Sequence, residues 1–278
     1  NSFGCGLDAV VTDQVQEIMH QRGRLYTCLK IDQSLNLGAV RIRLRSLKAA
    51  IEERGEEAGS AKPIEYPKAV FTEAMKRDKD YTILAPEMSP IHFPISEAAV
   101  QREGYHIEII PPIHEDIDKG LSCVNNDACY PAIITIGSLM RALTSGKYDL
   151  SKTAVMLSQT GGMCRASNYV GFLHKALDEA GLSDIPVISL NTHGFEPQPG
   201  FHFSLSMGRR MIQAVIYGDA LQQCLYRTRP YEKEPGSAET LCRSWQKRCI
   251  EAILSGESYT SYKKNIAGII QDFDRLPL

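Results

Sequence analysis

Apolar and polar positions follow two different periods along the middle of the chain. Short runs of apolar and β-branched residues predict four buried strands, over residues 81–85, 106–110, 153–157 and 186–190. Between them apolar residues recur every three or four positions, which predicts helices over 95–102, 132–143 and 167–180. Strands and helices that alternate in this way indicate a parallel sheet with right-handed crossovers.

The two ends of the chain have different patterns. The N-terminal end predicts a helix over 8–22 that stops at Gly23, a strand over 25–31 and a helix over 37–54. The C-terminal end is helical, with helices expected over 207–226, 238–254 and 258–273. We expect Gly208 and Gly218 to interrupt the first of these three helices.

These elements predict an α/β fold, with a parallel Rossmann-like sheet flanked by helices and a helical C-terminal segment. Residues 1–60 are expected to be the terminal helix-strand-helix part of a preceding domain. The composition then turns to charge, Gly, Ser and Pro between Glu52 and Lys68, and residues 61–80 are expected to form a linker. Residues 81–278 are expected to hold the Rossmann-like domain and the C-terminal helices.

Charge and composition narrow the class of protein. The 278 residues carry a formal net charge of −2 with both signs mixed, which argues against a nucleic-acid-binding protein. No apolar run reaches the roughly 20 residues of a membrane span, and the first residues do not resemble a signal peptide. We therefore expect a cytoplasmic protein. The chain starts on Asn1 rather than Met, which suggests a piece of a longer polypeptide.

Eight cysteines are candidates for chemistry, and none belongs to a C-x-x-C pair. Any metal site would therefore have to be assembled from distant loops. Without a signal peptide these thiols are expected to be reduced. Four of them are expected to be small buried apolar residues: Cys28, Cys224, Cys242 and Cys249.

The segment 158–169 places a cysteine where an apolar strand becomes a helix. Gly161 and Gly162 allow backbone N–H groups to converge on an anion or a thiolate. Cys164 precedes the predicted helix and has Arg165 beside it, which favours the thiolate that binds metals or attacks electrophiles.

Two further cysteines have similar surroundings. Cys129 comes just before a predicted helix whose first turn suits Pro131, with Asp127 as a candidate cap. Cys5 lies between two glycines ahead of the helix expected from residue 8. Three cysteines in turns that open helices are consistent with a cluster or metal held by thiolates. For Cys123 we expect a passive role.

Spacing alone leaves other chemistry open. The glycine turn could hold a phosphate of a nucleotide or of coenzyme A, although it lacks both GxxxxGK[ST] and GxGxxG. A cysteine nucleophile would need a histidine, and no spacing pairs one with Cys164; the candidates are His92, His114, His174 and His193. Arg227, Arg229 and Tyr231 could form an anion clamp, and a solvated charged turn is the simpler interpretation.

Four long segments together carry a family resemblance: 1–8, 29–43, 124–131 and 158–169. They resemble the 2-hydroxyacyl-CoA dehydratase superfamily. More narrowly, they are similar to the C-terminal part of long activator-type proteins, the 2-hydroxyglutaryl-CoA dehydratase activators or CoA-substrate-specific enzyme activases. The similarity covers nearly the whole chain, including residues 226–231.

The resemblance implies iron-sulfur chemistry. Such proteins hold a [4Fe-4S] or double-cubane cluster through cysteines on loops of Rossmann-like domains, and an ATP-hydrolysing activator supplies one electron at low potential for radical dehydration or reduction of an acyl-CoA. By motif, the implied ligands are Cys5, Cys129 and Cys164. The implied neighbours of the cofactor are Arg165, Asn168, Asn126, Gly161 and Gly162.

The resemblance also implies partners. One partner is an ATPase activator, either the N-terminal region of the same polypeptide or a separate protein. An acyl-CoA-type substrate and a homodimer are possible partners. Neither nucleic acid nor a membrane is expected to bind. The ATPase signatures are absent here, so this fragment alone is expected to be inactive. The cluster is expected in the parent polypeptide and could be absent from this fragment, because Cys5 could belong to a cluster completed by cysteines that precede residue 1. The alternatives are a non-catalytic module that binds a partner or nucleotide without a cluster, and a zinc-binding structural domain.

Overall fold

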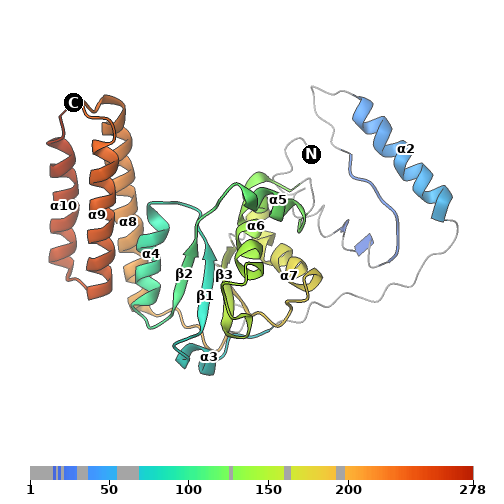
Figure 1. Ribbon diagram of the computed structural model, residues 1–278, viewed down its shortest axis with the longest axis horizontal. Helices are drawn as coiled ribbons and strands as arrows, with labels where there is room; N and C mark the ends of the chain where they lie inside the picture. Colours follow the sequence, from blue (N-terminus) through green and yellow to red (C-terminus); the bar gives the residue numbers. More distant parts are fainter. Residues whose placement is uncertain are drawn as a thin grey trace. The chain divides into compact units, whose positions relative to one another are not determined.

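The computed structural model describes residues 15–16, 18–19, 22–29, 37–54, 69–124, 128–159, 164–191 and 198–277 (Figure 1). The chain has the predicted α/β fold, with a parallel sheet, helices in the connections between its strands and a helical C-terminal region.

The sheet has four strands in the order β2-β1-β3-β4, and they run parallel. They are β1 (Thr82–Pro86), β2 (Ile107–Ile110), β3 (Thr153–Gln159) and β4 (Val187–Asn191). Ile83 pairs with Ile107, and Leu84 pairs with Val155. Both β1 residues are buried although they point to opposite faces, as expected for a parallel sheet covered on both sides. All four predicted strands are confirmed, with their ends moved by one or two residues.

The connecting helices largely confirm the prediction. They are α4 (His92–Gln101), α5 (Glu115–Leu121), α6 (Tyr130–Thr144) and α7 (Tyr169–Glu179), the last preceded by the 3₁₀ turn η2 (Arg165–Asn168). Helix α4 begins three residues earlier than predicted, because Pro94 is tolerated in the first turn of a helix. Helix α5 was not predicted.

The C-terminal region consists of α8 (Leu205–Thr228), α9 (Ser237–Ser255) and α10 (Tyr259–Asp274). These helices lie beside α4 in Figure 1 and share one apolar core with it. The predicted interruption of the first helix is wrong, since α8 is continuous. Gly218 serves packing instead: a Cβ there would lie 2.2 Å from Cδ2 of His92 in α4.

The N-terminal elements are described only in part. Helix α2 (Leu37–Arg54) has the predicted bounds and buries no residue. Residues 15–16 and 18–19 are helical and Gly23 has a φ of 59°, as its predicted role at a helix end requires; the rest of that predicted helix lies outside the described residues. The predicted strand 25–31 is wrong over 25–29, which are irregular, because no described strand pairs with them. The predicted linker contains α3 (Glu73–Arg77).

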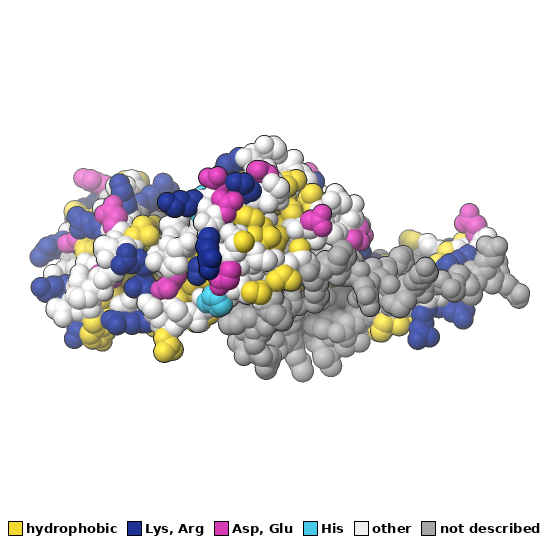
Figure 2. Space-filling view, turned by 90° about the horizontal axis from the view of Figure 1, so that it is seen from below, with side chains coloured by type: hydrophobic (Ala, Val, Ile, Leu, Met, Phe, Trp, Pro, Cys, Tyr) yellow, Lys and Arg dark blue, Asp and Glu magenta, His cyan; other side chains and the backbone are white. Residues whose placement is uncertain are grey.

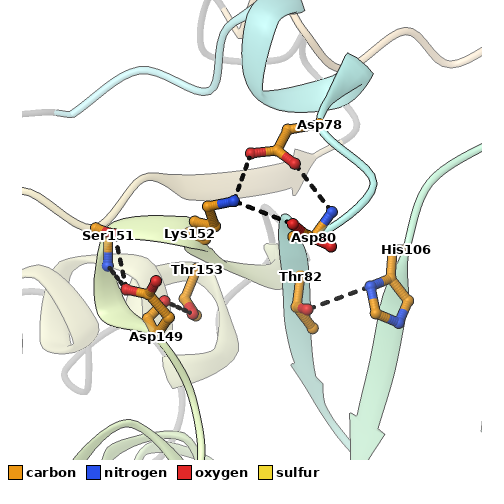
Figure 3. A network of polar contacts seen from close by, with 8 residues as sticks. All are labelled: Asp78, Asp80, Thr82, His106, Asp149, Ser151, Lys152 and Thr153. Carbon is orange, nitrogen blue, oxygen red and sulfur yellow. Dashed lines mark hydrogen bonds and ion pairs between the residues drawn. The ribbon is translucent and has the colours of Figure 1, made fainter.

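A polar network joins segments near the amino ends of β1 and β3 (Figure 3). Lys152 Nζ lies 3.2 Å from Asp78 Oδ2 and 3.2 Å from Asp80 Oδ2. Thr82 Oγ1 lies 3.2 Å from His106 Nδ1. Ligands of parallel α/β sheets bind beyond the carboxyl ends of the strands, so we assign this network a structural role.

The contacts divide the chain into two compact units. The first unit comprises Asn1–Ala69, Ile113–Arg141 and Leu157–Glu196; the second comprises Val70–Pro112, Ala142–Met156 and Pro197–Leu278. Positive and negative side chains are mixed over the face drawn in Figure 2. Within the described segments, no helix has both the length and the apolar character needed to span a membrane.

Candidate functional site

Cys129 occupies the position just before α6, in the first unit. Its carbonyl oxygen accepts hydrogen bonds from the N–H groups of Ala132, at 3.0 Å, and Ile133, at 3.2 Å. The thiol is half-buried, and its Sγ lies 3.7 Å from the hydroxyl oxygen of Tyr169, the first residue of α7. The prediction that Cys129 opens a helix is confirmed.

The start of α6 is fixed by the contact of this helix with α5. A Cβ on Gly137 of α6 would lie 1.9 Å from the carbonyl oxygen of Asp116, and a Cβ on Gly120 of α5 would lie 2.1 Å from that of Ile133. The two backbones therefore touch at both glycines. This contact fixes α6 against α5, and Cys129 directly precedes α6.

An ion pair also joins α5 and α6. The Asp116 carboxylate is fully buried and accepts a hydrogen bond from the N–H of Ile113 at 2.8 Å. Arg141 Nε binds the other carboxylate oxygen, and Arg141 Nη2 lies 3.3 Å from Asp116 Oδ2. A buried carboxylate is stable only when it is paired and hydrogen-bonded, and Asp116 has both kinds of partner.

Cys164 occupies the cap position of η2 and is exposed. Its carbonyl oxygen accepts a hydrogen bond of 3.0 Å from the N–H of Ser167. The turn η2 leads directly into α7. Cys164 lies five residues before Tyr169, the residue whose hydroxyl approaches Cys129. The N-terminal end of α7 is therefore close in sequence to one of these cysteines and in contact with the other.

Gln159 connects η2 to the sheet. Its Nε2 donates to the carbonyl oxygen of Ser167 at 3.2 Å, and its Oε1 accepts from the Ser189 hydroxyl at 2.8 Å. Ser189 lies in β4 and is fully buried. Neither Gln159 nor Ser189 was predicted as a site residue. The available signal was a polar residue at the end of an apolar strand.

Asn168 lies at the N-terminal end of α7 without a side-chain capping hydrogen bond. A Cβ on Gly171 would lie 2.5 Å from Asn168 Oδ1, so the absence of a side chain at Gly171 makes room for this amide. Of the other predicted site residues, Cys5, Asn126, Gly161 and Gly162 lie outside the described residues. The backbone of Arg165 begins η2, and its side chain also lies outside them.

The described part of the predicted donor set fits a thiolate-bound cofactor in type. Cys129 and Cys164 both precede helical segments, whose first backbone N–H groups have no partner within the helix. Two donors are fewer than a cluster needs, and within the described segments no group of three or more His, Cys, Asp or Glu residues could hold a metal ion.

The other cysteines separate into two groups. Cys224, Cys242 and Cys249 are buried in the C-terminal core, as predicted, and burial raises the pKa of Cys242 to about 11 and of Cys249 to about 12. These thiols therefore stay neutral near pH 7. Cys28 and Cys123 are half-buried, so the prediction that Cys28 is a buried apolar residue is wrong.

Two other predicted features take structural roles. His92 binds Ser89 Oγ through Nδ1 at 2.8 Å and Asp219 Oδ1 through Nε2 at 3.1 Å, all within the second unit. Arg227 forms an ion pair with Asp274, and Tyr231 is 70% exposed. Arg227 therefore lies in the exposed last turn of α8, and the 3₁₀ turn that follows it (Arg229–Tyr231) is exposed and charged as well.

Comparison with known protein families, with curated proteins and with solved structures finds no match to this chain.

Proposed function

We propose that this chain is part of an iron-sulfur component of the 2-hydroxyacyl-CoA dehydratase and activase system. In this proposal the parent polypeptide works in the cytoplasm of an anaerobe. It supports low-potential electron transfer for the radical dehydration or reduction of an acyl-CoA-type substrate. The observation that carries the proposal is the approach of Tyr169, at the start of α7, to Cys129, with Cys164 only five residues before that tyrosine.

The local chemistry of the two cysteines supports a shared role. Each thiol precedes a helical segment, whose first backbone N–H groups are available to a bound anion or thiolate. Cys164 follows the carboxyl end of β3, on the side of a parallel sheet where ligands bind. Cys129 and Cys164 also come from different loops, as the cluster ligands do in the proteins that this chain resembles.

The described residues have distinct roles in this proposal. Cys129 and Cys164 each supply a thiolate, and the Tyr169 hydroxyl donates a hydrogen bond to the sulfur of Cys129. Hydrogen bonds to ligand sulfur tune the potential of an iron-sulfur site. Gln159 positions η2, and with it Cys164. When bound, the cluster supplies the one-electron chemistry.

The remaining members of the proposed site follow the family resemblance. Cys5 completes the ligand set, and Asn126, Arg165 and Asn168 donate hydrogen bonds to the cofactor. The resemblance also makes Gly161 and Gly162 neighbours of the cofactor. The electron comes from an ATP-hydrolysing activator region of the same polypeptide or from a separate activator. Because Cys164 is exposed, this side of the site is open to such a partner.

Anaerobic reconstitution with iron and sulfide tests the proposal. The wild-type chain should gain broad charge-transfer absorption in the visible range, and Cys129→Ser and Cys164→Ser should each abolish most of it. Cys123→Ser is the matched control, because Cys123 is a half-buried cysteine of the same unit outside the proposed ligand set. A wild-type chain without the absorption, or serine variants that keep it, would overturn the assignment of the cluster to this chain.

The same samples identify the alternatives. Stoichiometric zinc after purification, measured by mass spectrometry of the metal content, would favour a zinc-binding structural domain. Thermal stabilisation by ATP without any cluster absorption would favour a nucleotide-binding module.

A further inference from the structure

Helix α8 has two unlike faces. One face packs into the C-terminal core through residues such as Ala214, Tyr217 and Leu221. The other face is exposed and carries a stripe of six residues: Leu205, Arg209, Ile212, Ile216, Asp219 and Gln223. Leu205 is 96% exposed, Ile212 63% and Ile216 43%, which is unusual for aliphatic side chains on one helix face.

The spacing of the stripe is regular. Successive members lie four, three, four, three and four residues apart, close to the 3.5-residue average of a heptad pattern. This heptad spacing is typical of helices that pair lengthwise with another helix. Because the core of the chain lies on the opposite side of α8, the stripe takes no part in that core.

The charges of the stripe match those of a second copy in one orientation only. In an antiparallel pair with its two-fold axis at Ala214, Ile212 lies opposite the partner's Ile216, and Arg209 lies opposite the partner's Asp219. Both contacts occur twice because of the symmetry. A parallel two-fold pair would instead place Arg209 opposite Arg209 and Asp219 opposite Asp219. Like charges in contact are unfavourable, so the charge pattern selects the antiparallel pair.

We propose that this chain forms a homodimer in which two copies of α8 pack antiparallel through this stripe. Asp219 remains available for the contact, since its side chain is 64% exposed and only its Oδ1 is bonded to His92. Helix α8 has 24 residues and a length of about 36 Å. One helix pair of this length buries less surface than a standard stable interface, so the dimer forms reversibly. The proposal is independent of the iron-sulfur chemistry.

Sedimentation velocity of the 278-residue chain over a concentration series tests this proposal. The average mass should rise from 30.9 kDa toward twice that value as the concentration increases. Arg209→Glu should remain monomeric, because the introduced carboxylate would face the partner's Asp219 in both contacts. Asp219→Lys should remain monomeric for the opposite reason. An equimolar mixture of the two variants should form heterodimers, since every charged contact in that pair is again between opposite charges.

Two further variants serve as controls. Arg243→Glu changes an arginine of α9 that lies outside the stripe and has a side chain that is 76% exposed. This variant should leave dimerisation unchanged. Ile212→Asp places a charge in the centre of the stripe and should abolish the dimer without touching His92. Circular dichroism melting of each variant confirms that it is folded.

Three results would overturn the proposal. The wild-type chain could stay monomeric at concentrations up to about 0.5 mM, well above the dissociation constants of weak specific dimers. A wild-type dimer could persist in Arg209→Glu and Ile212→Asp, which would place the interface elsewhere. The mixture of the two charge variants could remain monomeric, which would exclude the antiparallel register. If the wild-type chain stays monomeric, the stripe would instead be a candidate surface for binding a different protein.

Discussion

Gly137 of α6 lies against the backbone carbonyl of Asp116 in α5, so closely that a Cβ on Gly137 would be 1.9 Å from the carbonyl oxygen. The contact joins two backbones, and neither can move without shifting its helix. Both helices flank the segment that leads to Cys129. The position of Cys129 therefore depends on a glycine eight residues further along the chain.

Gly137→Ala should lower the free energy of unfolding by roughly 3 kcal/mol, because the added methyl group forces α5 and α6 apart. Urea unfolding followed by circular dichroism measures the change. Gly208→Ala is the matched control: its Cβ would meet only the ring of Phe203, at 3.1 Å, and that residue is 47% exposed, so its ring can give way. The control should be neutral or stabilising by up to about 1 kcal/mol, because alanine favours helix. A normal stability of Gly137→Ala would contradict the close contact.

Arg141→Met should destabilise the first unit by roughly 3 kcal/mol, because it leaves the Asp116 carboxylate buried without its counter-ion. Arg243→Met, which breaks an exposed pair with Glu239, should change stability by less than about 0.5 kcal/mol. Chemical denaturation of both variants gives the comparison. Equal losses would mean that the Asp116 pair contributes no more than a surface ion pair.

Acid should weaken the N-terminal end of α9 through Glu232. Its carboxylate accepts hydrogen bonds from the N–H groups of Gly236 and Ala238, both at 2.7 Å, and these bonds lower the pKa of Glu232 below its usual value. The stabilisation is therefore complete above the ordinary glutamate pKa and is lost as the pH falls through the lowered value. Melting temperatures of wild type and Glu232→Gln should differ at neutral pH and converge in acid, below the lowered pKa. A constant difference would argue against this role of the carboxylate.

Alkylation should proceed at different rates at the exposed thiol of the first unit and the buried thiols of the second. Iodoacetamide at neutral pH should modify Cys164 within minutes to hours, whereas Cys224, Cys242 and Cys249 should react only after unfolding, because burial keeps these three thiols neutral and inaccessible. Peptide mapping by mass spectrometry with and without urea gives the occupancy at each site. Rapid native labelling of Cys249 would show that the C-terminal core opens readily.

Tyr169→Phe should keep the buried ring and remove only the hydroxyl near Cys129. In a reconstituted sample, loss of a hydrogen bond to ligand sulfur should make the reduction potential of the cluster more negative. Tyr130→Phe is the control, because Tyr130 neighbours Cys129 in sequence and is 57% exposed. Redox titration followed by visible absorption measures both variants. A shift of equal size in Tyr130→Phe would contradict a specific role of Tyr169.

The strands and most helices could be predicted because the spacing of their apolar residues in the sequence matches the buried positions of each element. Ile83 and Leu84 lie in a continuous apolar run, and both are buried in the sheet. Helix α5 escaped prediction because its sequence EDIDKGL has few apolar positions and depends on contacts with α6. The predicted break at Gly218 failed for a related reason, since the packing of His92 favours a glycine there without ending the helix.

The site could be predicted only as far as local sequence reaches. The positions of Cys129 and Cys164 directly before helical segments are local features, and the structure has both. The approach of Tyr169 to Cys129 joins residues forty positions apart, and the bond between Ser189 and Gln159 joins residues thirty apart. Such contacts depend on how the strands and helices pack, which the periodicity of a segment does not encode.

The difference between accessible and buried cysteines has a consequence for oxidation of this protein during storage. Among the described thiols, an oxidant that enters a stored sample would first react with the exposed Cys164 and leave the buried thiols of the C-terminal core unreacted. The helical spectrum and the melting temperature of that core would then look unchanged while the proposed cofactor ligand was already lost. Circular dichroism would therefore not detect this loss, and a count of free thiols should accompany every activity measurement.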